Sequence, residues 1–111
     1  MKFDVKKEDG ITILTIKEKK LDSSISPELK AEFLILCKNT KCSKFIVDMK
    51  AVTFCDSSGL SALLIAHRSM NEHDGQVRFI NVHKSVLTLL KISQLDRVFN
   101  VHKTLKEAMK G

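Results

Sequence analysis

Segments with the apolar pattern of β-strands alternate with segments of helical periodicity along this chain, and this alternation constrains the fold more than any other feature. Strand patterns cover residues 3–7, 11–16, 44–54 and 76–82, with a brief extended piece at 98–101. Helical spacing of apolar residues covers 26–37, 58–71, 86–90 and 105–109. Strands that alternate with helices favour a sheet with mostly parallel strands and covered faces. The sequence therefore predicts an α/β fold, with a mixed, mostly parallel sheet of about four strands covered by about four helices.

Local signals place the ends of these elements. A Glu-Asp-Gly turn at residues 8–10 predicts a hairpin between the first two strands, because Asp and Gly tolerate positive φ. Ser26 is a candidate helix cap, and Pro27 suits the first helical position, where the N–H that proline lacks would be unpaired anyway. The run 44–54, KFIVDMKAVTF, is expected to form one central strand that ends near Phe54.

The length and composition are those of one folded domain. With 111 residues, 43% of them hydrophobic and 29% charged, the chain is expected to form a single domain over residues 1–111. No apolar run approaches the roughly 20 residues that a membrane-spanning helix needs, so no membrane insertion is expected. The first residues lack the pattern of a signal peptide. Three cysteines, an odd number, favour reduced thiols and a cytoplasmic location.

The net charge of +6 raises the question of nucleic-acid binding. Most of the 19 basic residues are lysines scattered over nearly every expected element, and the densest cluster, residues 17–20, contains an acid. The chain has no Trp or Tyr, and its six Phe residues lie within apolar runs. Stacking side chains interleaved with basic residues are therefore missing. A solvated lysine-rich surface explains the charge better, and no direct nucleic-acid contact is expected.

The stretch VTFCDSSGL, residues 52–60, places an acid, two hydroxyls and a glycine directly after an apolar strand. Function collects at such junctions in α/β sheets, because N–H groups of the helix N-terminus face the crevice. In the structural interpretation, Asp56 or Ser57 caps the helix and Gly59 allows it to pack closely on the sheet. Alternatively, a serine here attacks a substrate, or accepts a phosphoryl group from a kinase on the exposed first turn of the helix.

The enzymatic interpretation finds little support in the spacing. The hydrolase pattern G-x-S-x-G lacks its first glycine, and the phosphate-binding patterns G-x-x-x-x-G-K-[ST] and G-x-G-x-x-G are absent. A serine nucleophile also needs a base. The sequence context of the four histidines places none of them at the turn: His67, His73, His83 and His102. His67 falls on the apolar face of the expected second helix. Asp22 and Asp56 could form a carboxylate pair, although nothing in their spacing shows that they meet. No enzymatic activity is expected.

Metal binding is not indicated either. Cys37 and Cys42 lack a second pair of ligands at a convincing spacing. Cys37 and Cys55 have the surroundings of small buried apolar residues. The sequence therefore predicts no metal site and no cofactor.

The sequence FIVDMKAVTFCDSSGLSALL, residues 45–64, resembles the signature of STAS domains, the family of bacterial anti-sigma factor antagonists. The usual form of that signature is an apolar strand, an acid, a few residues, and D-S-S-G-L before a helix. The similarity extends along the chain. LDSSISPELK at residues 21–30 resembles the segment that leads into the family's first helix, and residues 89–109 resemble its C-terminal half. The resemblance implies a single STAS-like domain.

In that family, the first serine of the motif is phosphorylated by an anti-sigma factor that is itself an ATP-dependent serine kinase. By position, the resemblance implies that Ser57 is the phosphorylation site. It implies a partner-binding surface made of Asp22, Asp56, Ser57, Ser58 and Gly59. The unphosphorylated protein would bind the anti-sigma factor and so release a sigma factor. Phosphorylation of Ser57 would switch binding off, and a serine phosphatase would reset the switch.

Two positions depart from the family pattern. Ser61 stands where glycine is frequent, and residues 18–22, EKKLD, carry lysines where G-E-L-D or G-R-L-D is usual. These lysines make the face beside Asp22 more basic and could indicate a different partner. STAS domains also serve in stress-sensing scaffolds, transporter tails and a lipid-transport complex. The alternatives are therefore a constitutive STAS subunit of a stress-sensing or lipid-transport complex without a kinase switch, and a hydrolase built on Ser57.

Overall fold

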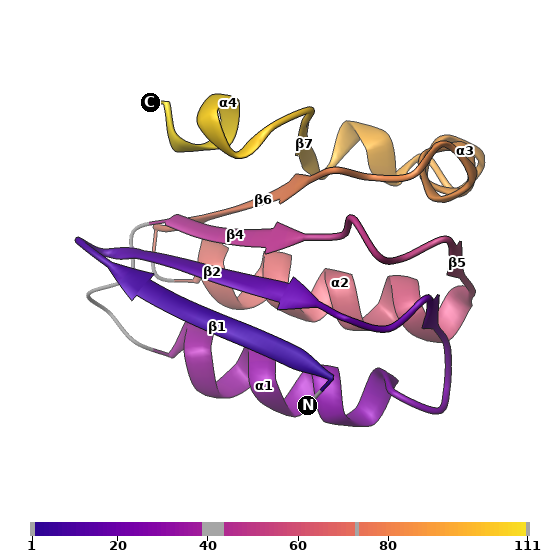
Figure 1. Ribbon diagram of the computed structural model, residues 1–111, viewed down its shortest axis with the longest axis horizontal. Helices are drawn as coiled ribbons and strands as arrows, with labels where there is room; N and C mark the ends of the chain where they lie inside the picture. Colours follow the sequence, from indigo (N-terminus) through magenta and orange to yellow (C-terminus); the bar gives the residue numbers. More distant parts are fainter. Residues whose placement is uncertain (1, 39–43, 73, 111) are drawn as a thin grey trace.

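The computed structural model describes residues 2–38, 44–72 and 74–110 and shows an α/β fold (Figure 1). The main sheet has the strand order β1-β2-β4-β6-β7, in which β1 is antiparallel to β2 and the other neighbours are parallel. Its strands are Phe3–Glu8 (β1), Ile11–Ile16 (β2), Lys44–Asp48 (β4), Gln76–Ile80 (β6) and Asn100–His102 (β7). The helices are Ser26–Cys37 (α1), Ser57–Asn71 (α2), Lys84–Ile92 (α3) and Leu105–Met109 (α4), with a 3-10 turn at Leu95–Arg97 (η1). The predicted α/β class and mixed, mostly parallel sheet are confirmed, with one strand more than expected in the main sheet.

The hairpin between β1 and β2 forms as predicted. Asp9 has a φ of 48° and Gly10 a φ of 79°, and a two-residue hairpin turn requires such positive values. The turn sets the register, in which Glu8 pairs with Ile11.

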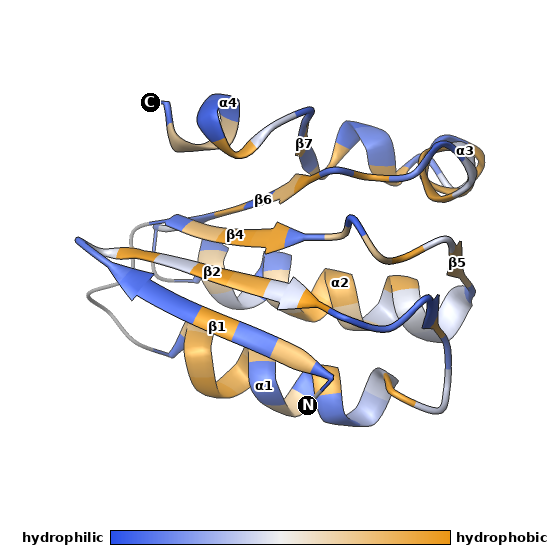
Figure 2. Ribbon diagram, viewed as in Figure 1, coloured by the Kyte–Doolittle hydropathy of each residue, from blue (hydrophilic) through white to orange (hydrophobic). Residues whose placement is uncertain are grey.

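Helices α1 and α2 lie side by side against one face of the main sheet, and the core fills the space between them and the strands (Figure 1). Figure 2 shows that central strand β4 is mostly hydrophobic whereas edge strand β1 is mostly hydrophilic. In β4, Phe45, Ile46 and Val47 are all fully buried, because both faces of this strand are covered. The ring of Phe33 from α1 meets Phe45 edge to face, with 5.7 Å between ring centroids.

The opposite face of the sheet is covered in part by the short helix α4. Ala108 of this helix packs on Ile46 and Ile80 of β4 and β6. The buried guanidinium of Arg78 donates hydrogen bonds to the backbone carbonyls of Ala108, at 2.7 Å, and Lys110. These bonds satisfy carbonyls that the end of a helix leaves unpaired, so Arg78 holds the C-terminal helix on the sheet.

The predicted single strand over 44–54 is wrong. Strand β4 ends at Asp48, whose carboxylate accepts a hydrogen bond from the N–H of Lys50 at 3.0 Å as the chain leaves the sheet. The chain becomes extended again only at Phe54–Cys55 (β5), which pairs in parallel with Lys20–Leu21 (β3) as a separate two-stranded sheet. The sequence of the run does not show where one strand ends and the next begins, because both halves have the same strand-like composition.

The starts of several elements also differ from expectation. Helix α2 begins at Ser57, one residue earlier than predicted, and strand β7 begins only at Asn100. The residue preceding α1 is Ile25, which provides no side-chain cap, so the prediction that Ser26 caps this helix is wrong. The Ser26 hydroxyl instead donates to the carbonyl of Ser58 at 2.8 Å. This hydrogen bond joins the first turns of α1 and α2.

We expect Arg78→Met to lower the free energy of unfolding by about 1–3 kcal/mol, because methionine fills a similar volume but leaves the buried carbonyl of Ala108 without its donor. Urea unfolding followed by circular dichroism measures the loss. Arg97→Met is the matched control, since Arg97 is exposed on η1 and should change stability little. Equal stability of the two variants would show that Arg78 does not hold α4.

Candidate partner-binding site

The turn between β5 and α2 is organised by Asp56, which caps the helix. Its backbone is extended, with φ −110° and ψ −170°, and its Oδ1 accepts a hydrogen bond from the N–H of Gly59 at 3.1 Å. This is the geometry of a side-chain N-cap, which satisfies one of the unpaired N–H groups of a helix start. Of the two caps considered from the sequence, Asp56 is the one that forms.

Ser57 and Ser58 occupy the first two positions of α2 and differ in their surroundings. Ser57 is exposed, and its hydroxyl makes no hydrogen bond to any residue that the structure describes. Ser58 is half-buried, and its carbonyl accepts the hydrogen bond from the Ser26 hydroxyl. Of the two hydroxyl-bearing residues, Ser57 is therefore the more accessible from solvent.

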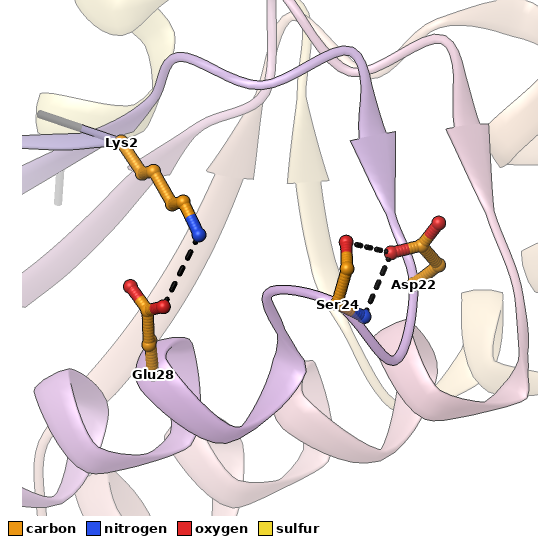
Figure 3. Close-up of polar contacts among 4 residues, drawn as sticks. All are labelled: Lys2, Asp22, Ser24 and Glu28. Atoms are coloured by element: carbon orange, nitrogen blue, oxygen red, sulfur yellow. Dashed lines mark hydrogen bonds and ion pairs between the residues drawn. The ribbon is translucent and has the colours of Figure 1, made fainter.

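Asp22 lies at the end of β3 and closes a tight turn (Figure 3). Its Oδ1 accepts hydrogen bonds from the hydroxyl and, at 2.9 Å, from the N–H of Ser24. These two bonds, the hydroxyl first, hold the pKa of Asp22 below its usual value. The carboxylate is therefore charged at neutral pH. The same view shows Lys2 paired with Glu28 of α1 at 3.1 Å, which ties the start of the chain to the first turn of that helix.

The parallel pair β3–β5 brings the expected site residues together. Leu21 pairs with Cys55, and the N–H of Asp56 donates to the carbonyl of Leu21 at 3.2 Å. Asp22 and Asp56 therefore follow adjacent strand ends at one edge of the small sheet. Each carboxylate has its own hydrogen-bond donors, so the arrangement does not require a proton shared between them.

Gly59 is where α2 touches the small sheet. A Cβ atom at this position would lie 2.4 Å from the carbonyl oxygen of Leu21 and 2.7 Å from the sulfur of Cys55. Both distances are shorter than van der Waals contact, and the first neighbour is backbone. The close packing of Gly59 that the sequence suggested is confirmed, and its contact is with β3 and β5.

The surroundings of the site give no support to a serine or cysteine nucleophile. Cys55 is buried, and burial, followed by the neighbouring charge of Asp56, raises the pKa of its thiol to about 12. His67 lies half-buried farther along α2, where its ring packs on Phe99 with 5.8 Å between centroids. Burial lowers the pKa of His67, with a smaller effect from the charge of Arg68.

Other histidines and cysteines that the sequence analysis considered lie elsewhere. His83 caps α3, where its ring nitrogen Nδ1 accepts from the N–H of Ser85 at 3.3 Å. Cys37 is buried at the end of α1. Cys42 and His73 lie outside the described residues. Within 2–38, 44–72 and 74–110, no group of three His, Cys, Asp or Glu side chains is arranged to hold a metal ion.

Sequence reasoning missed three participants in the site. Leu21 supplies the carbonyl that excludes a side chain at position 59, Ser26 links α1 to α2, and Phe54 is half-exposed on β5. Strand β3 is only two residues long, so it has no alternating pattern from which a strand could be predicted. The one sequence signal for it was Leu21, an apolar residue between the lysines and Asp22.

Comparison with known proteins identifies the family. The STAS domain family model matches residues 2–108, and the chain belongs to this family. The anti-sigma F factor antagonist of Paenibacillus polymyxa is 22% identical over 102 residues, which are 92% of this chain and 86% of that protein. A solved Thermotoga maritima structure, provisionally assigned as an anti-sigma factor antagonist, superposes with a TM-score of 0.88 at 22% identity, covering 96% of this chain and 91% of that one. The phosphorylated form of Bacillus SpoIIAA has a TM-score of 0.73 at 18% identity, with 96% of each chain covered.

Among the helices that the structure describes, none is long and apolar enough to cross a membrane.

Adding a methyl group at position 59 tests the contact with β3 and β5. Alanine normally favours a helix over glycine by about 1 kcal/mol. We nevertheless expect Gly59→Ala to lower the free energy of unfolding by about 1–3 kcal/mol, because the new Cβ overlaps the Leu21 carbonyl. Ser61→Ala, at an exposed position two residues later in the same helix, is the control and should be nearly neutral or stabilising. A stabilised Gly59→Ala protein would contradict the observed packing.

Proposed function

We propose that this protein is a cytoplasmic anti-sigma factor antagonist, acting as a single STAS domain, whose binding is switched off by phosphorylation of Ser57. The observation that carries the proposal is the exposed Ser57 hydroxyl, free of hydrogen bonds to the described residues, at the first position of a helix whose cap is already supplied by Asp56. The similarity to anti-sigma factor antagonists supports the same role.

In this proposal the unphosphorylated surface binds an anti-sigma factor and thereby frees a sigma factor. Asp22, Asp56, Ser57 and Ser58 lie at one edge of the β3–β5 sheet and form the centre of the contact, and buried Gly59 holds the first turn of α2 in place behind them. The anti-sigma factor is itself a serine kinase that transfers the γ-phosphoryl group of ATP to the Ser57 hydroxyl, and a serine phosphatase later hydrolyses the phosphate ester.

Phosphorylation is expected to act locally. A phosphoryl group at the start of α2 meets the favourable end of the helix dipole, which contributes about 0.3–1 kcal/mol at the surface. The carboxylate of Asp56 opposes this, but water and salt weaken repulsion between exposed charges. The fold therefore tolerates the added charge, whereas an interface that buries a neutral hydroxyl does not. The solved phosphorylated form of SpoIIAA, whose fold is similar, supports this view.

Phosphorylation by the cognate kinase tests the acceptor. Incubation with the anti-sigma factor and ATP should place one phosphate on Ser57, because it is the more exposed of the two serines at the start of α2. Peptide mass mapping locates the phosphate. The Ser57→Ala protein should remain unmodified, while Ser58→Ala should be modified as the parent is. Phosphate on Ser58 or Ser23 would contradict the assignment to Ser57. No phosphate at all would contradict it too and would favour the constitutive-subunit alternative.

Charge substitution at the same residue separates a local switch from unfolding. Ser57→Asp should melt within about 3 °C of the parent. It should bind the anti-sigma factor up to about a thousandfold more weakly, because an unpaired buried charge costs several kcal/mol. Ser57→Ala should keep both stability and binding, and should not be released by ATP. Thermal melting and calorimetric titration measure the two effects. Normal binding by Ser57→Asp, or its unfolding, would contradict the local switch.

A further inference from the structure

The outer face of the β3–β5 sheet carries a basic and apolar surface next to Ser57. Lys20 pairs with Phe54 in the parallel register, and Leu21 pairs with Cys55. Because successive side chains of a strand point to opposite faces, Leu21 and Cys55 face the core while Lys20 and Phe54 face outward together. Lys19 precedes β3, so the alternation does not place it on this face, but it is exposed and its carbonyl accepts a hydrogen bond from the N–H of Phe54 at 3.1 Å. We call Lys20 and Phe54, together with the adjacent Lys19, the basic β3–β5 face.

Phe54 differs from the other aromatic residues by its exposure. It is 49% exposed, whereas Phe33, Phe45, Phe79 and Phe99 are at most 4% exposed and Phe3 is half-buried against the core. A single exposed apolar residue needs no explanation in itself. This one, however, lies three residues before Ser57 and directly opposite a lysine, and aromatic side chains are frequent anchors of protein interfaces.

The lysines of this face form no close ion pair with the described residues, although, after the hydrogen bonds from Ser24, the charge of Lys20 also helps to lower the pKa of Asp22. Lys17 forms an ion pair with Asp4 at 2.8 Å, whereas Lys19 and Lys20 are exposed and form no ion pair with any described residue. The turn that carries them borders a hollow of about 420 Å³.

The start of α3 lies against β5, because the Ser85 hydroxyl donates a hydrogen bond to the carbonyl of Thr53, the residue before Phe54, at 2.7 Å. Exposed Lys84 precedes that serine.

We propose that the basic β3–β5 face docks against an acidic protein surface that offers an apolar pocket to Phe54. The proposal rests on the function proposed above, because the partner is the one whose binding Ser57 controls. Lys19 and Lys20 pair with carboxylates of the partner, and Phe54 fills its pocket. Nucleic acid or an anionic membrane fits this mixed surface less well, because their phosphate groups present one sign of charge throughout. A protein can place carboxylates opposite Lys19 and Lys20 and hydrogen-bond donors opposite Asp22 and Asp56.

An acidic partner also supplies a physical reason for release. A phosphoryl group on Ser57 adds about −1.5 to −2 charges beside this face. Those charges lie at the edge of a contact whose other side is negative, so they repel the partner directly. Salt screens such repulsion over about 10 Å at 0.1 M, so both binding and release should depend on ionic strength.

The experiment measures Kd for the purified cognate anti-sigma factor at about 50 mM and about 300 mM NaCl. Lys19→Glu/Lys20→Glu and Phe54→Ala are compared with Lys6→Glu/Lys7→Glu and Ile35→Ala. The control lysines are exposed on β1 toward its hairpin end, which lies across the molecule from β5 (Figure 1), and Ile35 is 68% exposed on α1. Each variant of the basic face should bind more than about tenfold more weakly at low salt, with the controls within about twofold of the parent. The double lysine variant should also lose most of the salt dependence.

Two further results separate this inference from the proposed function. If the parent binds, Ser57→Asp does not, and both face variants bind like their controls, the docking inference is overturned and the phosphorylation switch stands. If the parent does not bind any anti-sigma factor, the proposed function and the docking inference are both overturned. Phosphatidylglycerol vesicles and a DNA duplex are parallel probes, and tighter binding to either, lost in Lys19→Glu/Lys20→Glu, would overturn the choice of a protein partner. Thermal melting shows whether Phe54→Ala is folded. If Phe54→Ala is unfolded, Lys19→Glu/Lys20→Glu still tests the inference, because both lysines are exposed.

Discussion

The contact between the start of α2 and the small β3–β5 sheet is the constraint on which the site depends. No side chain fits at position 59, because the Leu21 carbonyl and the Cys55 sulfur fill the space that a Cβ would need. Around this contact, the N–H of Asp56 binds the Leu21 carbonyl and the Ser26 hydroxyl binds the Ser58 carbonyl. Helices α1 and α2 and strand β3 are therefore joined at one point, which holds the first turn of α2 in place.

That rigidity gives the surface its defined pattern of charge. Asp56 is held by the N–H of Gly59 and Asp22 by Ser24, so both carboxylates stay at the edge of the small sheet. Lys20 projects from the outer face of the same sheet. Positive and negative groups thus lie within one small area, arranged by backbone pairing rather than by ion pairs between them. In the proposed function, such a surface would distinguish partners by charge, and a change of charge at Ser57 would alter recognition more readily than the fold.

Much of the architecture could be predicted from the sequence because local rules agree with the fold. Strand and helix periods alternate as α/β structure requires, the turn at Asp9 and Gly10 has the residues that positive φ favours, and Asp56 has the side chain that a helix start prefers. The predicted strand over 44–54 failed for a specific reason. Its two halves pair with different neighbours: β4 pairs with β2 and β6, whereas β5 pairs with β3. The amino-acid composition of the run does not show where the pairing partner changes.

The sequence by itself determined the class of fold and a capped helix start within residues 56–58, because each depends on the properties of a few neighbouring residues. Only the tertiary structure decided that Asp22 lies beside this turn, that Ser26 reaches Ser58, and that Phe54 and Lys20 share one outer face. These relations join residues about 32–34 positions apart in the chain. Contacts at such separations arise from the pairing of β3 with β5 and the packing of α1 against α2, and no local pattern of residues encodes them.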